Sequence, residues 1–435
     1  MSRRLLITFG VVAVIVIFFA LVFTGVIPGL KQEIKTGAVT LTMWGVFDSP
    51  QAFAAVIGAY QQKFSNIRIN YRQFAPENYE RELVNALAAG KGPDMFMVHN
   101  TWLPKHDDKM SPLPQAALPI ATFRVLFPRV VEQDFAPDGV IYALPLYIDT
   151  LALYYNKDLF DNAGIALPPK TWSEVAALIP KLRVIDRKGA VTRAGAAIGG
   201  TPRSVNRATD LLALLMMQAG APMVAPNFSR ADISSKGGRT GLDFYTQFAD
   251  PKNSAYTWND NLHYSLDAFA EGGAAMMFNY AYNMNALKQK NPFLAFGVSA
   301  MPQPATAQAR VDYPNYFGLA VATKSRAPGT AWDFIKFLTT QDASAKTYLS
   351  ATKHPPALRT LIAANANDPD IGVFTNQALT ARSYPQIDNI EVERIMGELL
   401  ENVVYGKLDK QRALEQAEAD KCPLSYFRIV SYVRR

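Results

Sequence analysis

Strand-like and helix-like segments alternate along the first part of the polar body of the chain, and this alternation restricts the fold more than any other feature. The apolar stretch 39–43 is followed by a helical pattern that begins at Pro50, where proline suits the first turn of a helix. The same order continues through a strand at 67–71, a helix over 76–90 and a strand at 95–98. Such alternation predicts an α/β fold with a parallel or mixed sheet covered by helices, and with ligands beyond the carboxyl ends of the strands.

The length of the chain favours more than one compact unit. With 435 residues it is about three times as long as a typical single domain. Apolar residues make up 49% of it and charged residues 19%, so it can build large cores and lacks the signature of disorder. A second unit is expected around Thr171 and Glu174, which have the capping-box spacing of a helix start. From residue 331 to about 420 the pattern is almost entirely helical, so helices gather at the C-terminal end.

The N-terminus carries an apolar segment. Residues 5–27 are 23 positions without a charged side chain, preceded by Arg3 and Arg4. As a helix this segment spans the roughly 30 Å hydrocarbon core of a bilayer. It is longer than the apolar region of a cleaved signal peptide, which is the alternative, so we expect a signal-anchor transmembrane helix over residues 1–30 and a linker over 31–37. The positive-inside rule then predicts a single-pass protein of the cell membrane with a cytoplasmic N-terminus and an extracytoplasmic body.

Sequence motifs of the common enzyme classes are absent. There is no Walker-type phosphate loop, no GxGxxG after a strand, no GxSxG and no HExxH. The single cysteine, Cys422, cannot close a disulfide within the chain, and the four histidines lack zinc spacing, so neither a metal nor a cofactor is expected. The chain has a net charge of +7 but no run of more than two consecutive Lys or Arg residues, which argues against nucleic-acid binding. We therefore expect a protein that is not an enzyme.

Four blocks of sequence distinguish this chain from a generic α/β protein. LTMWGVFDSPQAF occupies residues 41–53 and AAGKGPDMFMVHNTW residues 88–102. YALPLYIDTLALYYNKDLFDNAGIALPPKTWSEV covers 142–175, and FAEGGAAMMFNYAYNM covers 269–284. Together they resemble the family 1 extracellular solute-binding proteins, the maltose-binding-protein-like receptors of ABC importers. The third block is the most specific, because YALP, LYYNKDLF and PPKTW follow one another in it, and the resemblance extends over nearly the whole body.

The resemblance implies a two-lobed α/β fold like that of periplasmic binding proteins. In such a fold the chain crosses between the lobes more than once, and the ligand binds in the cleft, which closes by a hinge motion. By similarity, crossings are expected near residues 147–150, near 280–287 and around Gln341. The expected division of the chain is 38–147 with 285–340 for lobe one, and 148–284 with 341–435 for lobe two.

Candidate ligand residues are those that suit a sugar. Sugars present hydroxyl edges and apolar C–H faces, so their sites combine carboxylates and amides with aromatic rings. By resemblance, Asp149 matches the acidic sugar ligand of maltose receptors and is the foremost candidate. Asp48 matches a further acidic contact, and Tyr282 matches a stacking tryptophan. The remaining candidates lie in loops that the resemblance places at the cleft: Trp44, His99, Asn100, Trp102, Thr201, Arg203, Trp258, Asn279, Tyr280, Asn315 and Tyr316.

Structural roles would also explain several of these residues. Asp149 could supply hydrogen bonds at a hinge, Asp48 could cap the helix that Pro50 begins, and Tyr280 and Tyr282 could pack at a hinge. If these residues bind a ligand, we expect the chain to be a monomeric, membrane-tethered receptor that captures an oligosaccharide or sugar derivative for the permease of an ABC importer. An extracytoplasmic enzyme acting on glycans is the alternative from another class, and a peptide or polyamine ligand is the alternative within the same fold.

Overall fold

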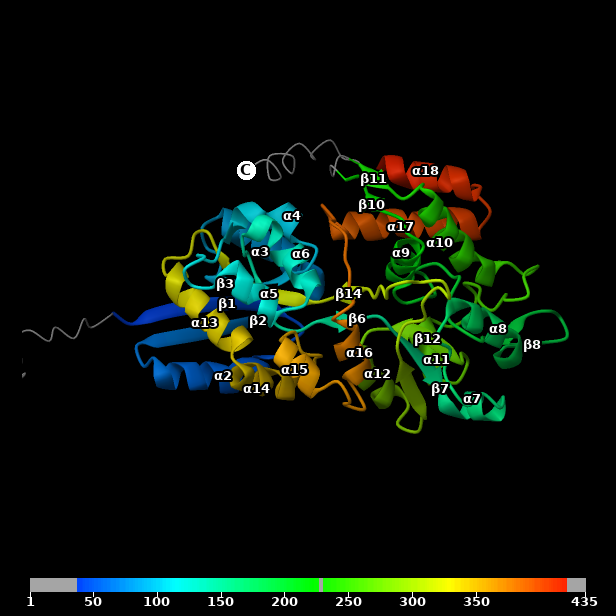
Figure 1. Ribbon diagram of the computed structural model, residues 1–435, viewed down its shortest axis with the longest axis horizontal. Coiled ribbons are helices and arrows are strands. Elements are labelled where there is room, and N and C mark those ends of the chain that lie inside the picture. The colour runs from blue at the N-terminus through cyan, green and yellow to red at the C-terminus, as the bar shows by residue number, and fades with distance from the viewer. Residues whose placement is uncertain (1–36, 227–229, 421–435) are drawn as a thin grey trace, which may run out of the picture.

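Buried apolar side chains form two separate cores, one in each of the two lobes that lie side by side in Figure 1. The computed structural model describes residues 37–226 and 230–420. The buried residues of the first core come from between Leu41 and Ile148 and between Tyr316 and Ala381, and those of the second from between Leu151 and Tyr313 and between Phe374 and Ala417. The two-lobed α/β architecture expected from the sequence is therefore present.

A mixed sheet of six strands forms the centre of the first lobe. Its order is β2-β1-β3-β15-β4, with β5 paired to β15. β1 is parallel to β2 and β3, whereas β15 is antiparallel to β3. All six residues of β15 are buried, as expected of an inner strand with both faces covered. The strands are β1 Val39–Val46, β2 Ile67–Phe74, β3 Met95–His99, β4 Met110–Ser111, β5 Leu144–Pro145 and β15 Phe317–Ala322.

The helices of the first lobe come from both ends of the chain. α2 begins at Pro50, as the sequence predicts, and buries Phe53, Val56 and Tyr60. α14 packs against both α2 and α13, so residues far apart in sequence share one core. The helices are α2 Pro50–Lys63, α3 Pro76–Ala88, α4 Leu103–His106, α5 Ile120–Leu126, α6 Arg129–Phe135, α13 Pro328–Thr340, α14 Asp342–Thr352 and α15 Arg359–Ala364.

The second lobe has a smaller sheet, β12-β7-β13, which is entirely antiparallel. The predicted capping box is present, since the Thr171 hydroxyl accepts from the amide of Glu174 and the Glu174 carboxylate accepts from the amide of Thr171. The apolar stretch 194–198 makes only one isolated bridge, between Ala194 and Ala274. The strands are β7 Ala152–Asn156, β8 Val184–Ile185, β9 Val191–Arg193, β10 Met223–Val224, β11 Ala231–Asp232, β12 Met276–Asn279 and β13 Phe296–Ser299.

Helices α9 and α10 pack closely in the second lobe because one of them presents glycine. A Cβ atom at Gly241 of α10 would lie 2.6 Å from the backbone nitrogen of Met216 in α9. The C-terminal helices α17 and α18 pack on this pair. The helices are α7 Lys157–Asn162, α8 Trp172–Leu182, α9 Ala208–Gln218, α10 Lys236–Thr246, α11 Ser265–Ala270, α12 Asn283–Lys290, α17 Asn389–Val404 and α18 Lys410–Asp420.

The lobes are joined by two short strands and a helix that lie between them in Figure 1. β6 (Asp149–Thr150) pairs antiparallel with β14 (Pro314–Asn315), and the third connection passes through α16 (Gly372–Gln377). The first crossing is the one expected at residues 147–150. The other two crossings occur later in the chain than expected.

The observed cores correct the expected division of the chain. No crossing occurs at 280–287, because α12 buries Met284 and Leu287 in the second core and keeps residues 285–313 in the second lobe. Gln341 is likewise no crossing, because α14 and α15 bury Tyr348 and Leu361 in the first core. The third crossing therefore lies beyond residue 362 rather than at Gln341.

The described part of the chain contains no helix that is long and apolar enough to cross a membrane. The signal anchor expected over residues 1–30 lies outside the described residues, as does nearly all of the linker expected over 31–37.

Asp134 on α6 connects the first lobe to the two later crossings. Its carboxylate accepts hydrogen bonds from Tyr316 Oη at 2.7 Å, from Asn100 Nδ2 at 3.1 Å and from the hydroxyl of Ser383. Burial raises the pKa of Asp134 from 3.8 to about 7, although these three hydrogen bonds oppose the rise. The carboxyl therefore holds a proton in the folded state under conditions where the unfolded chain has lost it.

We expect this raised pKa to make stability depend on pH. Between about pH 4 and 7 the folded state binds more protons than the unfolded state, so the stability from Asp134 is full at the acidic end and is lost as the pH rises. Relative to Asp134→Asn, the free energy of unfolding should fall by up to ~1.4 kcal/mol per pH unit across this range. Urea denaturation of both proteins at several pH values measures the difference, and parallel pH profiles would contradict the raised pKa.

Candidate functional site

A cavity of about 960 Å³ lies between the lobes, beyond the carboxyl ends of the inner strands of the first lobe. Phe47 follows β1 and His99 ends β3, and both line the cavity. Arg207 and Tyr282 line it from the second lobe, and Asn315 lines it from the hinge strand β14. This is the position at which an α/β sheet is expected to bind a ligand.

The second lobe supplies an aromatic face to this cavity. The ring of Tyr282 stacks on that of Tyr280, with centroids 5.5 Å apart and an interplanar angle of 19°. Tyr280 is fully buried, whereas Tyr282 is 40% exposed. Arg207 Nε donates a hydrogen bond to Tyr282 Oη at 2.8 Å, so the exposed ring is held from its edge as well as from behind. A fixed, exposed ring of this kind can pack against the C–H face of a sugar.

The first lobe supplies aromatic side chains to the same cavity. Trp102 stacks on the buried ring of Tyr79, with centroids 6.0 Å apart. Phe47 is 55% exposed and meets Phe317 edge to face at 5.6 Å. Both lobes thus present rings to one space, which is the arrangement that lets a single ligand contact both lobes.

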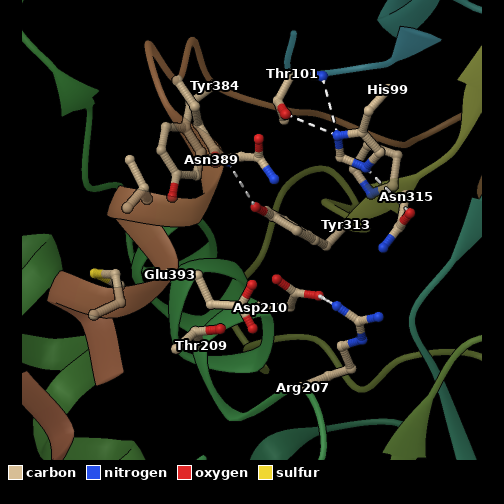
Figure 2. Close-up of a pocket in the computed structure, with 14 residues that line it drawn as sticks. His99, Thr101, Arg207, Thr209, Asp210, Tyr313, Asn315, Tyr384, Asn389 and Glu393 are labelled. Atoms are coloured by element: carbon tan, nitrogen blue, oxygen red, sulfur yellow. Dashed lines mark hydrogen bonds and ion pairs between the residues drawn. The ribbon is translucent and has the colours of Figure 1, made fainter. Parts of the chain in front are cut away.

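A smaller polar cavity of about 80 Å³ adjoins the large one and is drawn in Figure 2. Figure 2 shows Arg207 paired with Asp210, with the side chain of Glu393 directed into the same space. Desolvation raises the pKa of Asp210, and desolvation together with Asp210 raises that of Glu393. The two cavities share His99, Arg207, Asn315, Asn389 and Glu393. The shared polar groups can therefore reach a ligand in the large cavity.

His99 is a neutral member of this polar set. Its Nδ1 lies 2.7 Å from Thr101 Oγ1, and its Nε2 lies 3.2 Å from Asn315 Oδ1. Burial lowers the pKa of His99 to about 4, although the bond to Asn315 opposes this. The imidazole is therefore uncharged at neutral pH and acts as a hydrogen-bonding group.

The structure brings four of the predicted ligand residues to the wall of the large cavity: His99, Trp102, Tyr282 and Asn315. It places the other ten elsewhere: Trp44, Asp48, Asn100, Asp149, Thr201, Arg203, Trp258, Asn279, Tyr280 and Tyr316.

Asp149, the foremost candidate, lies in the hinge and not at the cavity wall. Its side chain is 1% exposed and accepts hydrogen bonds from the backbone amides of Thr150 at 2.8 Å, Ala281 at 3.0 Å and Tyr282 at 3.2 Å. Burial raises its pKa to about 7 against the effect of these bonds. The hinge hydrogen bonds considered as its alternative role are thus the ones that the structure shows.

Asp48 also does not line the large cavity, but it contacts a residue that does. It accepts hydrogen bonds from Tyr348 Oη at 2.7 Å and from His354 Nε2 at 3.0 Å, and it does not cap α2. His354 in turn stacks on Tyr147 with centroids 4.0 Å apart, and these two rings line the cavity. Asp48 therefore positions lining residues rather than lining the cavity itself.

Most of the other candidates that do not line the large cavity have partners inside the lobes. Trp258 donates to Ser204, Thr201 bonds to Asp260, and Tyr280 donates to Asp210. Asn100 and Tyr316 both donate to Asp134, Asn279 donates to Asn206, and Trp44 packs on Phe74, while Arg203 is exposed away from the cavity.

Sequence reasoning missed several lining residues. Phe47 and Arg207 have positive φ angles of 62° and 60°. No sequence pattern predicts this backbone conformation at these two residues. Asn389 and Glu393 reach the cavity from the start of α17, about 290 residues after β3. Tyr147 lies in the third block two residues before Asp149, and its sequence context does not distinguish it from the other aromatic residues of that block.

The described residues contain no group of three or more His, Cys, Asp or Glu side chains that could hold a metal ion.

Two α/β lobes, a hinge and a cleft lined from both sides define a hinged binding protein. Residues 44–345 match the profile of the bacterial extracellular solute-binding proteins, and the chain belongs to this family of binding proteins rather than enzymes. A binding protein of Brucella abortus is 24% identical over 84% of this chain and 88% of its own length. The maltotriose-binding protein of Pyrococcus abyssi is 22% identical over 78% and 70%. The sugar-binding protein MalE of Xanthomonas citri matches with a TM-score of 0.74 at 21% identity, over 91% and 98% of the two chains.

We expect Asp149→Ala to destabilise the fold. The change leaves the amides of Ala281 and Tyr282 without their acceptor in a buried hinge, which costs about 1 to 3 kcal/mol. Urea denaturation gives the free energy of unfolding. A variant of unchanged stability would show that the carboxylate is not needed by the hinge and would return Asp149 to the ligand candidates.

Proposed function

We propose that the protein is the extracytoplasmic receptor of an ABC importer and that it binds a carbohydrate in the cleft between its lobes. One observation carries the proposal: exposed aromatic rings and neutral or paired polar groups line the same cavity from both lobes. Tyr282 and Phe47 provide the exposed rings, and Asn315, His99 and Arg207 provide hydrogen bonds. Sugars require this combination because they have apolar faces and hydroxyl edges.

The charges of the cavity support a sugar over a polyamine. A polycation would be matched by an excess of carboxylates, whereas the acidic and basic side chains balance among the described residues that line the cavity. The acidic ones are Glu77, Glu80 and Glu393, and the basic ones are Arg81, Lys105 and Arg207. The names of similar proteins also support a sugar, since one binds maltotriose and another is a sugar-binding protein.

Binding would work by closure of the lobes and without chemistry on the ligand. A ligand that contacts rings on both lobes stabilises the closed form by its differential affinity for that form. The hinge strands β6 and β14 and the segment through α16 are the elements that would absorb the motion. The permease would then recognise the closed, loaded receptor.

We also propose that the receptor is tethered to the cell membrane through its N-terminal apolar segment, as a monomer with its body outside the cytoplasm. The uncharged run of residues 5–27 after Arg3 and Arg4 supports this location. N-terminal sequencing of the protein from cell fractions tests it. Recovery of the protein in the medium with a new N-terminus would contradict the tether.

A thermal-shift screen tests the ligand class. Saturating ligand stabilises the native state by RT ln(1 + [L]/Kd), which is about 2.7 kcal/mol at one hundred times Kd. The panel contains malto- and manno-oligosaccharides, monosaccharides, peptides and polyamines. We expect a rise in Tm with one class of sugar and no product formed. Stabilisation by peptides or polyamines alone would overturn the carbohydrate, and conversion of a glycan would favour an enzyme.

Tyr282→Ala should weaken sugar binding by at least about tenfold, or ~1.4 kcal/mol, because it removes the exposed ring of the stacked pair. Isothermal titration with the sugar found in the screen measures the change. Tyr405→Ala is a matched control, because Tyr405 is also 40% exposed and does not line the cavity. Equal effects of the two substitutions would exclude Tyr282 from the site.

A further inference from the structure

Besides the hinge, the lobes touch where α4 of the first lobe meets the start of α17 in the second. Lys105 Nζ lies 2.7 Å from Asp388 Oδ2 and 2.8 Å from Glu80 Oε1, so one ammonium group joins a carboxylate of each lobe. Trp102 Nε1 donates to Asn389 Oδ1 at 3.0 Å next to this pair. We refer to these five residues as the latch.

The latch is built into its surroundings on both sides. In the first lobe, burial raises the pKa of Glu80, but hydrogen bonds from His106 and Lys105 outweigh it and lower the pKa to about 2. In the second lobe, Asp388 uses its other oxygen to accept from the amides of Ile390 and Glu391 and so caps α17. The carboxylate that receives Lys105 is therefore fixed by the helix it begins.

The helix held by the latch carries part of the cavity wall. Asn389, Ile390 and Glu393 of α17 all line the large cavity, within two turns of Asp388. Lys105 and Trp102 line it from the opposite lobe. The distance between the walls thus depends on whether the latch is closed.

We propose that Lys105 is a positioning residue that latches the start of α17 to the first lobe and holds part of the population closed in the absence of ligand. Affinity for the ligand then depends in part on the ion pair between Lys105 and Asp388, which forms between the lobes and not with the ligand. The inference rests on the proposed function only in taking the cleft as the ligand site.

Lys105→Met and Asp388→Asn test the latch in ligand-free protein. The first substitution removes the ammonium group, and the second removes the charge while asparagine keeps a capping oxygen for α17. Spin labels on cysteines at the exposed positions Gln62 and Lys181, in a Cys422→Ser background, report the distance between the lobes. Lys109→Met is the matched control, because Lys109 pairs with Asp108 inside the first lobe. Circular dichroism confirms that each variant is folded.

We expect each latch variant to lower the ratio of closed to open molecules by about two- to fivefold, the range for partly exposed ion pairs. The double variant should open no further than the single ones, and Lys109→Met should match the parent protein. Unchanged distances in both single variants, or effects that add in the double variant, would overturn the latch. Because no sugar is present, a protein that opens as expected but binds no sugar would keep the latch and overturn the proposed function.

Discussion

The structure depends on the need to satisfy polar backbone where the chain passes from one lobe to the other. At each crossing the backbone leaves the sheets that would otherwise pair it, and an unpaired buried amide or carbonyl is costly. One buried carboxylate meets this need directly, because Asp149 accepts from three backbone amides. Two other buried carboxylates join side chains at the crossings: Asp134 accepts from Tyr316 and Ser383, and Asp312 accepts from Thr380 and Arg310. The crossings are therefore tied to one another by side chains rather than by a continuous sheet.

The same hydrogen bonds place the cleft. Asp149 accepts a hydrogen bond from the amide of Tyr282, whose ring forms the exposed aromatic face in the second lobe. Asp134 accepts a hydrogen bond from the hydroxyl of Tyr316, which is the neighbour of Asn315. Lining residues are thus either bonded to the hinge themselves, as Tyr282 is, or next to such a residue, as Asn315 is. A change in hinge angle must move the wall of the cavity, and a ligand that pulls on Tyr282 and Asn315 acts directly on the crossings. Buried polar networks suit this task, because they accept few alternative arrangements.

The sequence predicts the first elements of the first lobe, one helix start in the second lobe and one of the three crossings, because these features are local. Pro50 starts its helix, the capping box at Thr171 forms, and His99 and Trp102 reach the cavity because they follow a buried inner strand. The cavity wall on α17 could not be predicted, since only the folded hinge brings Asn389 to Trp102. The position of Asp149 could not be predicted for another reason: a carboxylate in a characteristic block looks the same in the sequence whether backbone amides or a ligand bind to it.

Backbone strain gives a last indication of where the molecule is specialised. Five described residues other than glycine have positive φ, and Phe47, Arg207 and Lys353 among them line cavities between the lobes. Such a conformation costs of order 1 kcal/mol or more for a residue with a Cβ, and glycine would remove the cost. Glycine would also remove the ring of Phe47 and the guanidinium that holds Tyr282. At Phe47 and Arg207, one in each lobe, the strained backbone thus accompanies a side chain that lines the cleft.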